Sequence, residues 1–395
     1  MNSRQNTLAV VLCAMVAYSA GASEFRIVGP RALSMGGAGV ARPDGAFAAY
    51  YNPAALALHP ESKAVALSLG ISARDTGLGE HLQSIMDLDV DWDQATKNPQ
   101  GPDAAKIIDQ IKQINSNDGL FVLPGGALGV KAGPLGLGAY PSAQVAIYAD
   151  LDKVHMNPTD PTTDPDSFFY NTSTLHAQGL GLVEVPIAYG MRFNAGDGAL
   201  CVGGALKFME GITYDVSQQL TTDMKDVQDK LQNADKTATS FGVDAGALYE
   251  TGSGGFTAGL IVRNLNSPKF ETVNGDKFAE KMQARAGVAY SITKSVEADA
   301  DVDLTANETL VSDYKSRKAG GGLCWQATRG MSLRGGLMTN LEGGSAPVVF
   351  CAGLALGFQS FNLDLAAAVP SKWTTIDDYK IPGDGSVTLM LKSAW

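Results

Sequence analysis

The chain has 395 residues, a formal net charge of −11 and a pI of about 4.9. An acidic chain without a basic patch argues against nucleic acid as a partner, and no long basic run is present to attract anionic lipid. Glycine is abundant, at 45 residues, without the period of collagen. The mean hydropathy of −0.01 is the balance expected when strands show one face to lipid and the other to a polar interior.

The first 22 residues have the pattern of an export signal. Arg4 precedes the apolar run "TLAVVLCAMVAYSA", and Ala20-Gly21-Ala22 forms a small-x-small cleavage site. The apolar run is too short for a membrane-spanning helix. We therefore expect residues 1–22 to be removed on export, leaving a mature chain that begins near Ser23.

From residue 61 onward the chain alternates apolar and polar residues in short segments separated by Gly, Asn and Asp, which predicts strands. Fourteen are expected: 62–72, 120–132, 136–150, 179–193, 198–212, 238–251, 255–265, 283–292, 295–305, 317–328, 330–340, 347–358, 360–369 and 386–395. The last, "SVTLMLKSAW", ends on an aromatic residue and resembles the C-terminal signal of bacterial outer-membrane barrels.

Short and long connections alternate along these segments. Short turns such as "GPL" and "NAGD" follow the even strands, whereas residues 73–119, 151–178 and 213–237 are long. This alternation is typical of a barrel with short periplasmic turns and long outer loops. We therefore predict an all-β, transmembrane antiparallel β-barrel of about 14 strands over residues 61–395, with both termini on the periplasmic side.

The long loops carry two further patterns. Apolar residues at helical spacing predict amphipathic loop helices within 101–119 and 220–237. Carboxylates at alternate positions in 87–93 could share a calcium ion, although this loop does not match an EF-hand, and 157–167 is another acidic, Pro-rich loop. A solvated outer loop explains both. We expect no metal site and no cofactor.

Strand 295–305 has the most distinctive faces. Val296, Ala298, Ala300, Val302 and Leu304 alternate with Glu297, Asp299, Asp301 and Asp303. Four carboxylates cannot face hydrocarbon, so this strand predicts a polar interior. Like charges on neighbouring positions call for basic partners, and the same parity points Arg285, Lys318 and Arg334 inward. The sequence thus predicts a charged patch on the lumen wall; the alternative is a generic solvated wall.

Two prolines interrupt predicted strands. Pro186 and Pro124 cannot donate to a ladder and are rare in central strands. They predict a bulge or a local gap between strands. The more specific hypothesis is that such a gap forms a lateral opening in the wall.

Neither cysteines nor histidines form a reactive arrangement. Cys201, Cys324 and Cys351 lack metal-ligand spacing and are expected to be packing residues. The four histidines are scattered and none pairs with a nucleophile. We find no catalytic constellation and expect no enzyme activity.

The stretch "RALSMGGAGVARPDGAFAAYYNPAALA" (31–57), placed before the predicted barrel, resembles the FadL superfamily of outer-membrane proteins. It is also similar to the TraF-type and PorV-like families. In FadL-like channels the Asn-Pro-Ala element belongs to a small N-terminal hatch that plugs the barrel. The resemblance implies a plug over residues 23–60, with Asn52, Pro53 and Ala54 as its motif.

Local physics supports a helix in this motif. Asn is a favourable N-cap and Pro suits the first helical position, so "PAALALHP" predicts a short helix that begins at Asn52 and ends at Pro60. Gly36, Gly37 and Gly39 are expected to let the backbone pack closely against the wall.

The resemblance implies a plugged channel in the outer membrane of a Gram-negative bacterium, for passive uptake of hydrophobic or amphipathic small molecules. Its partners would be outer-membrane lipids and such a ligand, held between the plug and the outer loops. The charged lumen favours an alternative: a structural component of a conjugal transfer or secretion apparatus, with another envelope protein as partner.

Overall fold

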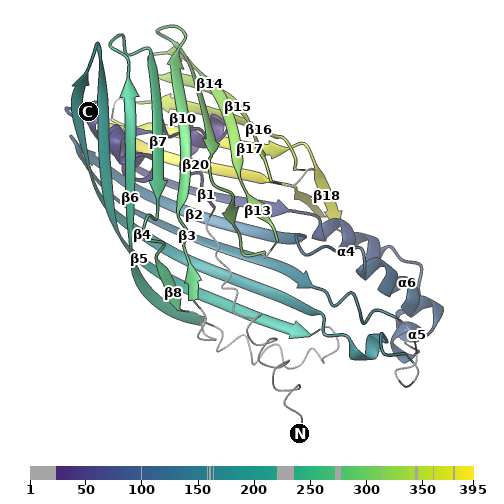
Figure 1. Ribbon diagram of the computed structural model, residues 1–395. Coiled ribbons are helices and arrows are strands. Elements are labelled where there is room, and N and C mark those ends of the chain that lie inside the picture. Colours follow the sequence, from purple (N-terminus) through teal and green to yellow (C-terminus); the bar gives the residue numbers. More distant parts are fainter. Residues whose placement is uncertain are drawn as a thin grey trace.

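The computed structural model describes residues 24–395 except 99, 158, 160, 161, 163, 220–234, 272–276, 312, 343–345, 359, 377 and 378. Fourteen antiparallel strands close into one barrel (Figure 1). In sheet order these are β1 (Lys63–Asp75), β2 (Gly119–Ala132), β3 (Leu135–Asp150), β4 (Thr174–Ala195), β5 (Gly198–Gln219), β6 (Asp235–Glu250), β7 (Phe256–Arg263), β10 (Gln283–Ser291), β11 (Val296–Asp303), β14 (Lys318–Thr328), β15 (Met331–Asn340), β16 (Val349–Gly357), β17 (Asn362–Pro370) and β20 (Gly385–Ala394).

All fourteen predicted strands are confirmed, and the barrel closes where the first meets the last. β1 pairs with β20 from Ala64↔Ala394 to Ala73↔Gly385. Lys63 and Trp395 also exchange backbone hydrogen bonds of 2.8 and 2.9 Å, so the final residue belongs to the seam. The expected signal segment, residues 1–22, lies outside the described residues.

Short elements lie inside the barrel and in its outer loops. Before β1 lie α2 (Pro30–Ser34), η1 (Gly45–Phe47), α3 (Ala48–Tyr51) and η2 (Pro53–Ala57); the outer loops contain α4 (Leu78–Met86), α5 (Trp92–Lys97), α6 (Pro102–Ile111), η3 (Phe168–Tyr170) and the hairpins β8 (Lys269–Glu271)–β9 (Lys277–Ala279), β12 (Asn307–Glu308)–β13 (Lys315–Ser316) and β18 (Trp373–Ile376)–β19 (Tyr379–Pro382). α6 confirms the helix predicted within 101–119. Most of the second predicted loop helix lies outside the described residues, and Asp235 already begins β6.

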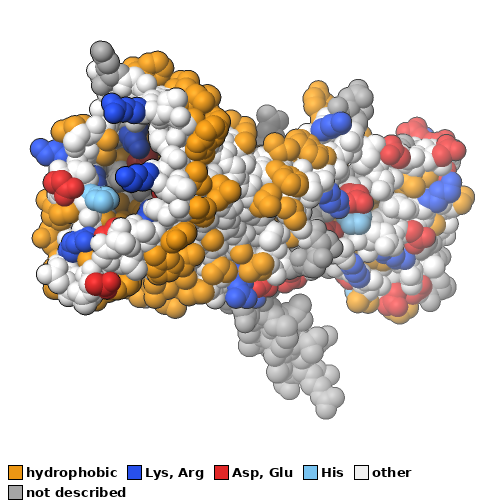
Figure 2. Space-filling model, turned by 90° about the horizontal axis from the view of Figure 1, so that it is seen from above, with side chains coloured by type: hydrophobic (Ala, Val, Ile, Leu, Met, Phe, Trp, Pro, Cys, Tyr) orange, Lys and Arg blue, Asp and Glu red, His pale blue; other side chains and the backbone are white. Residues whose placement is uncertain are grey.

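The outward face of the barrel is apolar. On β1, Leu67, Leu69 and Ile71 point outward and are 51, 61 and 53% exposed. Large apolar residues alternate in the same way along the other strands, for example from Val183 to Phe193 on β4. Figure 2 shows hydrophobic side chains along the wall and charged side chains gathered toward the two ends. This belt matches the lipid-facing band of transmembrane barrels. In the described part of the chain, no helix is both long and apolar enough to span a membrane.

The wall is much taller on one side than on the other. β4 and β5 each have 22 residues, whereas β10 has 9 and β11 has 8. The hairpins β8–β9 and β12–β13 lie at the outer end of the short side, and apolar side chains from both pack against β2–β5. They close the gap that the unequal strands would leave above the short wall.

Candidate functional site

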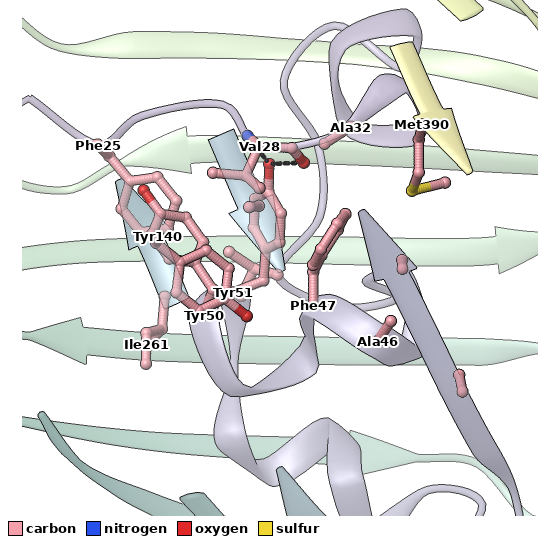
Figure 3. Close-up of a cluster of buried hydrophobic side chains, with 14 residues drawn as sticks. Phe25, Val28, Ala32, Ala46, Phe47, Tyr50, Tyr51, Tyr140, Ile261 and Met390 are labelled. Carbon is pink, nitrogen blue, oxygen red and sulfur yellow. Dashed lines mark hydrogen bonds between the residues drawn. The ribbon is translucent and has the colours of Figure 1, made fainter. Parts of the chain in front are cut away.

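The barrel interior is filled by the N-terminal residues 24–58, which we call the inner segment. Figure 1 shows its purple helices inside the barrel, near the end that carries the C-terminus. Phe25, Phe47, Tyr50 and Tyr51 are buried and pack with Tyr140 of β3 (Figure 3). The Tyr51 hydroxyl donates to Val28 O at 2.9 Å and accepts from Val28 N at 2.6 Å. The segment thus has a small core of its own.

Asn52 fixes the turn of the Asn-Pro-Ala motif. Its side-chain Oδ1 accepts from Ala54 N at 3.1 Å, which caps η2, and Pro53 occupies the first helical position. Its Nδ2 donates to Val40 O at 3.2 Å and to Ala247 O and Leu260 O on the wall at 3.4 Å. The predicted cap is present, and the same amide also binds the segment to β6 and β7.

The predicted helix differs from the observed one in length and type. η2 is a 3₁₀ helix that ends at Ala57, well before Pro60. The chain must turn back toward β1 at this point, and Leu58 N donates to Ala55 O, three residues earlier, at 3.2 Å. Short 3₁₀ pieces are common where a chain changes direction. The preceding turn α3 was not predicted.

The three predicted packing glycines do not share one role. A Cβ on Gly36 would lie 2.3 Å from Leu337 O on the wall, as expected, and its φ of 69° also favours glycine. A Cβ on Gly37 or Gly39 would instead meet side chains of the segment first, namely Ile27 and the Tyr51 ring. The backbone of both nevertheless contacts the wall, as expected: Gly37 O accepts from Arg285 at 3.3 Å, and Gly39 N–H donates to Asp301 at 2.9 Å.

The acidic face of β11 points inward, as predicted, but it is not solvated. Arg31 of the inner segment binds Glu297 and donates to Asp299 at 2.9 Å. Asp301 accepts from the backbone N–H of Gly39 and Val40 at 2.9 and 3.0 Å. Three carboxylates of β11 therefore hold the inner segment. Two features that the sequence presented separately, the small-residue stretch and the acidic strand, form one interface.

The three predicted basic partners divide among different carboxylates. Arg285 pairs with Asp303 at 2.6 Å, as the patch required. Lys318 Nζ lies 3.4 Å from Asp384, and only its backbone N–H reaches Asp303. Arg334 pairs with Asp364 on β17 at 2.7 Å. The expected patch centred on β11 is thus right for Arg285 and wrong for the side chains of Lys318 and Arg334. Arg31 and Arg42 of the inner segment supply the charge near Glu297.

Above the segment, buried charges form what we call the charged layer. Five carboxylates and five basic side chains make it up: Glu24, Glu184, Asp244, Asp303 and Asp384 with Arg74, Lys207, Arg263, Arg285 and Lys318. Lys207 lies 2.7 Å from Glu184 and 3.1 Å from Asp244, and Arg263 stacks over Tyr50 at 4.1 Å. The charges balance, which is the condition for keeping ions in an interior.

Glu24 and Asp44 attach the segment to the two strands of the seam. Glu24 accepts from Arg74 of β1 at 3.1 and 3.2 Å. Burial alone would raise the pKa of Glu24, but Arg74 and Lys318 outweigh it and lower the pKa to about 2. Asp44 binds Lys392 of β20 at 2.6 Å, and this partner lowers the pKa of Asp44 against the effect of burial. Both carboxylates are therefore ionised at neutral pH.

On the outer side of the charged layer lies an apolar compartment. Its buried members come from β2–β5 and from the two inward hairpins: Phe121, Ala146, Tyr148, Leu180, Leu182, Met209, Phe270, Phe278, Leu310 and Val311. Leu123 and Tyr314 border it. Inward residues along β4 and β5 therefore change from apolar to charged to small as the strands descend toward the inner segment.

Two cavities adjoin the apolar compartment. The outer one has a volume of about 260 Å³, is lined mainly by polar residues and includes Tyr314. The inner one, of about 80 Å³, lies between the inner segment and β1, β2 and β20, and includes Leu123 and Pro124. It is smaller than the roughly 150 Å³ cavity that holds benzene in an engineered protein core. Entry of a solute of that size requires side chains to move.

Both predicted strand-breaking prolines lie at interruptions of the ladder around β3. Pairing is missing at residues 123–124 and 126–127 of β2, and at 138–139 of β3 opposite Val185 and Pro186 of β4. The register is the same on both sides of each gap, so no bulge is involved. Pairing of β4 with β5 continues without a break over the full strand. Pro141, which the sequence reasoning did not single out, is the third proline at this place.

The cysteines all face the inner segment. Cys201 packs with Ala54 and neighbouring segment residues, Cys324 with Met35 and Ala38, and Cys351 with Leu33. All three are buried and free. They are packing residues, as expected, and they lie beneath different parts of the segment.

The sequence reasoning missed most of the charged layer. The pairing of Glu184 and Asp244 with Lys207 and Arg263 was not predicted, and neither was the Glu24–Arg74 pair. The available signal was a charged residue at an inward position on each of several successive strands. The partners themselves depend on the register between strands, which the sequence does not give.

These observations define a class: a closed 14-stranded transmembrane β-barrel whose N-terminal segment lies in its lumen. Two solved structures share the fold. The Ralstonia pickettii toluene transporter TbuX is 14% identical, with a TM-score of 0.53 over 94% of this chain and 99% of that one. The monoaromatic hydrocarbon channel CymD is 12% identical, with a TM-score of 0.54 over 94% and 98%.

The family is given by the sequence itself. The model described as "F plasmid transfer operon, TraF, protein" matches residues 49–303, which is more than half of the chain. The chain belongs to this family. Among curated proteins, none matches the sequence.

Proposed function

We propose that the protein is a passive channel for hydrophobic or amphipathic small molecules in the outer membrane. The observation that carries this proposal is the apolar compartment between two cavities. It adjoins the outer cavity through Tyr314 and the inner cavity through Leu123. The likeness of the fold to a toluene transporter and a hydrocarbon channel agrees with it.

The charged layer makes a straight route toward the periplasm unfavourable for such a solute. An apolar molecule that entered it would separate buried ion pairs, and breaking one costs about 3–5 kcal/mol. The ladder interruption offers another exit. Pro124 and Ala143 border both the inner cavity and the unpaired stretch of β2 and β3. We therefore propose that the solute leaves sideways through the wall around β3, while the inner segment closes the straight route.

A matched pair of substitutions on one strand tests the compartment. Leu182 of β4 faces the compartment, whereas Leu175 of the same strand is 41% exposed on the outward face. A polar group without a partner in an apolar site costs about 1–3 kcal/mol. Leu182→Asn should therefore lower uptake roughly tenfold, and Leu175→Asn should leave it unchanged.

The measurement is entry of the apolar dye N-phenyl-1-naphthylamine into cells that express each variant at equal surface levels. A gel-mobility shift on heating verifies that each barrel is folded. Equal uptake by both folded variants and the parent would rule out the compartment as the route.

The alternative from the sequence, an assembly component of a transfer apparatus, rests on the description of the family. It predicts that deletion of the gene leaves dye uptake unchanged and that a stable complex with an envelope protein can be isolated. The uptake assay separates the two proposals directly.

A further inference from the structure

We infer that the inner segment is the template on which the barrel closes. The first observation is the surface on which it rests. Ten wall glycines would each place a Cβ within 3.0 Å of a segment atom: Gly129, Gly136, Gly190, Gly203, Gly246, Gly287, Gly320, Gly322, Gly336 and Gly353. They come from nine of the fourteen strands: β2, β3, β4, β5, β6, β10, β14, β15 and β16.

This surface costs the wall stability when the segment is absent. Glycine in a strand weakens it, because it adds backbone entropy to the unfolded chain and no side chain to pack. At five of these positions, namely Gly129, Gly136, Gly190, Gly203 and Gly246, the three atoms nearest to such a Cβ all belong to the segment, so a wall built to close alone could carry alanine there; at the other five a wall atom also lies within 3.0 Å. These five glycines gain a role only when the segment fills the space, as where a Cβ on Gly203 would lie 2.4 Å from Ala54 N.

The second observation is charge at the seam. β1 and β20 close the barrel, and each carries a basic side chain whose carboxylate partner is on the segment. Arg74 of β1 binds Glu24 with 3% of its side chain exposed, and Lys392 of β20 binds Asp44. Without the segment, Lys392 would lose the carboxylate of Asp44, and Arg74 would keep only Asp384 at 3.4 Å. The seam strands would then carry less compensated charge as they pair, which is unfavourable in an interior.

The third observation is enclosure. Arg31 of the segment contacts β11, and Asn52 contacts β6 and β7. Phe47 packs in one cluster with Met390 of β20, at the seam. The segment is thus surrounded by wall, with the charged layer above it. It also precedes every strand in the chain. This enclosure favours docking of the segment before β20 pairs with β1, independently of which solute the barrel passes.

Refolding of the full chain from urea into detergent micelles tests the order of events. Closure is followed by gel mobility, and docking by protection of Cys201, Cys324 and Cys351 from a pulse of maleimide, mapped by peptide mass. A template predicts that protection appears before closure or with it. Closed barrels whose three cysteines still react as fast as in urea would overturn the inference.

A pair of adjacent glycines gives the matched control. A Cβ on Gly204, on the outward face, would meet nothing closer than 3.6 Å. Gly203→Ala should slow closure at least tenfold, whereas Gly204→Ala should close at the parent rate or faster. If the wall closes by itself, both substitutions should be neutral or favourable, and that result contradicts the template.

A suppressor distinguishes a clash with the segment from damage to the wall. A Cβ on Gly353 would lie 2.5 Å from Ser34 Cβ on the segment and 3.0 Å from Leu365 O on the wall. Gly353→Ala should slow closure, and Ser34→Gly in the same chain should restore the part of the rate that is lost to the closer contact. Failure of this rescue, with Ser34→Gly alone closing normally, would place the defect in the strand and count against the inference. Neither result depends on uptake of any solute.

Discussion

Replacing Asn52 should loosen one end of the inner segment without unfolding the barrel. In Asn52→Ala, the N–H of Ala54 loses its cap, which costs about 1 kcal/mol, and the buried oxygen of Val40 loses its donor, which costs about 1–2 kcal/mol more. The ladders of β6 and β7 keep their own hydrogen bonds. We therefore expect the free energy of docking η2 on the wall to become less favourable by about 2–3 kcal/mol in total.

The native cysteines report this change. Cys201 lies beneath Ala54, so its reaction with maleimide requires η2 to leave the wall. Because each 1.4 kcal/mol is a factor of ten in population, Cys201 should react roughly 30- to 100-fold faster in Asn52→Ala. Cys324, beneath Met35, should change less. The control is Asn194→Ala at an exposed position of β4. Equal Cys201 rates in the two folded variants would refute the reasoning.

Three further predictions concern the same interface. Arg31→Met leaves Asp299 with less counter-charge. Since Arg31 is partly exposed, docking of the segment should become less favourable by about 2 kcal/mol. Maleimide should then label Cys324 at least tenfold faster, and an unchanged rate would contradict the pairing. The pKa of Glu24 falls from 4.5 to about 2 on folding, so its contribution is complete above pH 4.5 and is lost as the pH falls toward 2. Pepsin should therefore cut Glu24→Gln near residue 24 faster than the parent at pH 4.5, and this difference should shrink toward pH 2; equal rates at pH 4.5 would contradict the pairing. The hydroxyl of Tyr140 is buried without a hydrogen-bond partner among the described residues, so Tyr140→Phe should unfold at the parent temperature or above, and a clear loss in a melting experiment would reveal a partner.

Much of the wall could be predicted because strand patterns are local. Alternation along β11 placed Glu297, Asp299 and Asp301 on an inward face, and alternating loop lengths gave the pattern of short turns at one end and long loops at the other. The cap formed by Asn52 and Pro53 was also predictable, since it involves residues only two apart. These features follow from the chemistry of neighbouring residues, and the structure confirms them.

The ladder interruption shows where this local reasoning stops. Pro124 and Pro186 were visible as irregular positions, but Pro141 was read as part of a continuous strand. Only the register brings the three strands together so that the ladders on both sides of β3 are interrupted. The apolar compartment is a similar case, because Phe270 and Leu310 belong to loop hairpins that fold inward.

The sequence by itself determined that this chain forms a barrel with a polar interior and a capped turn near its N-terminus. The tertiary structure decided what that interior does. Arg31 meets Asp299 across 268 residues of sequence, and Gly203 accommodates the backbone of Ala54. Such contacts arise from strand register and barrel closure, which no short stretch of sequence encodes. The acidic strand and the small-residue stretch therefore became one interface only when the barrel closed around its own N-terminus.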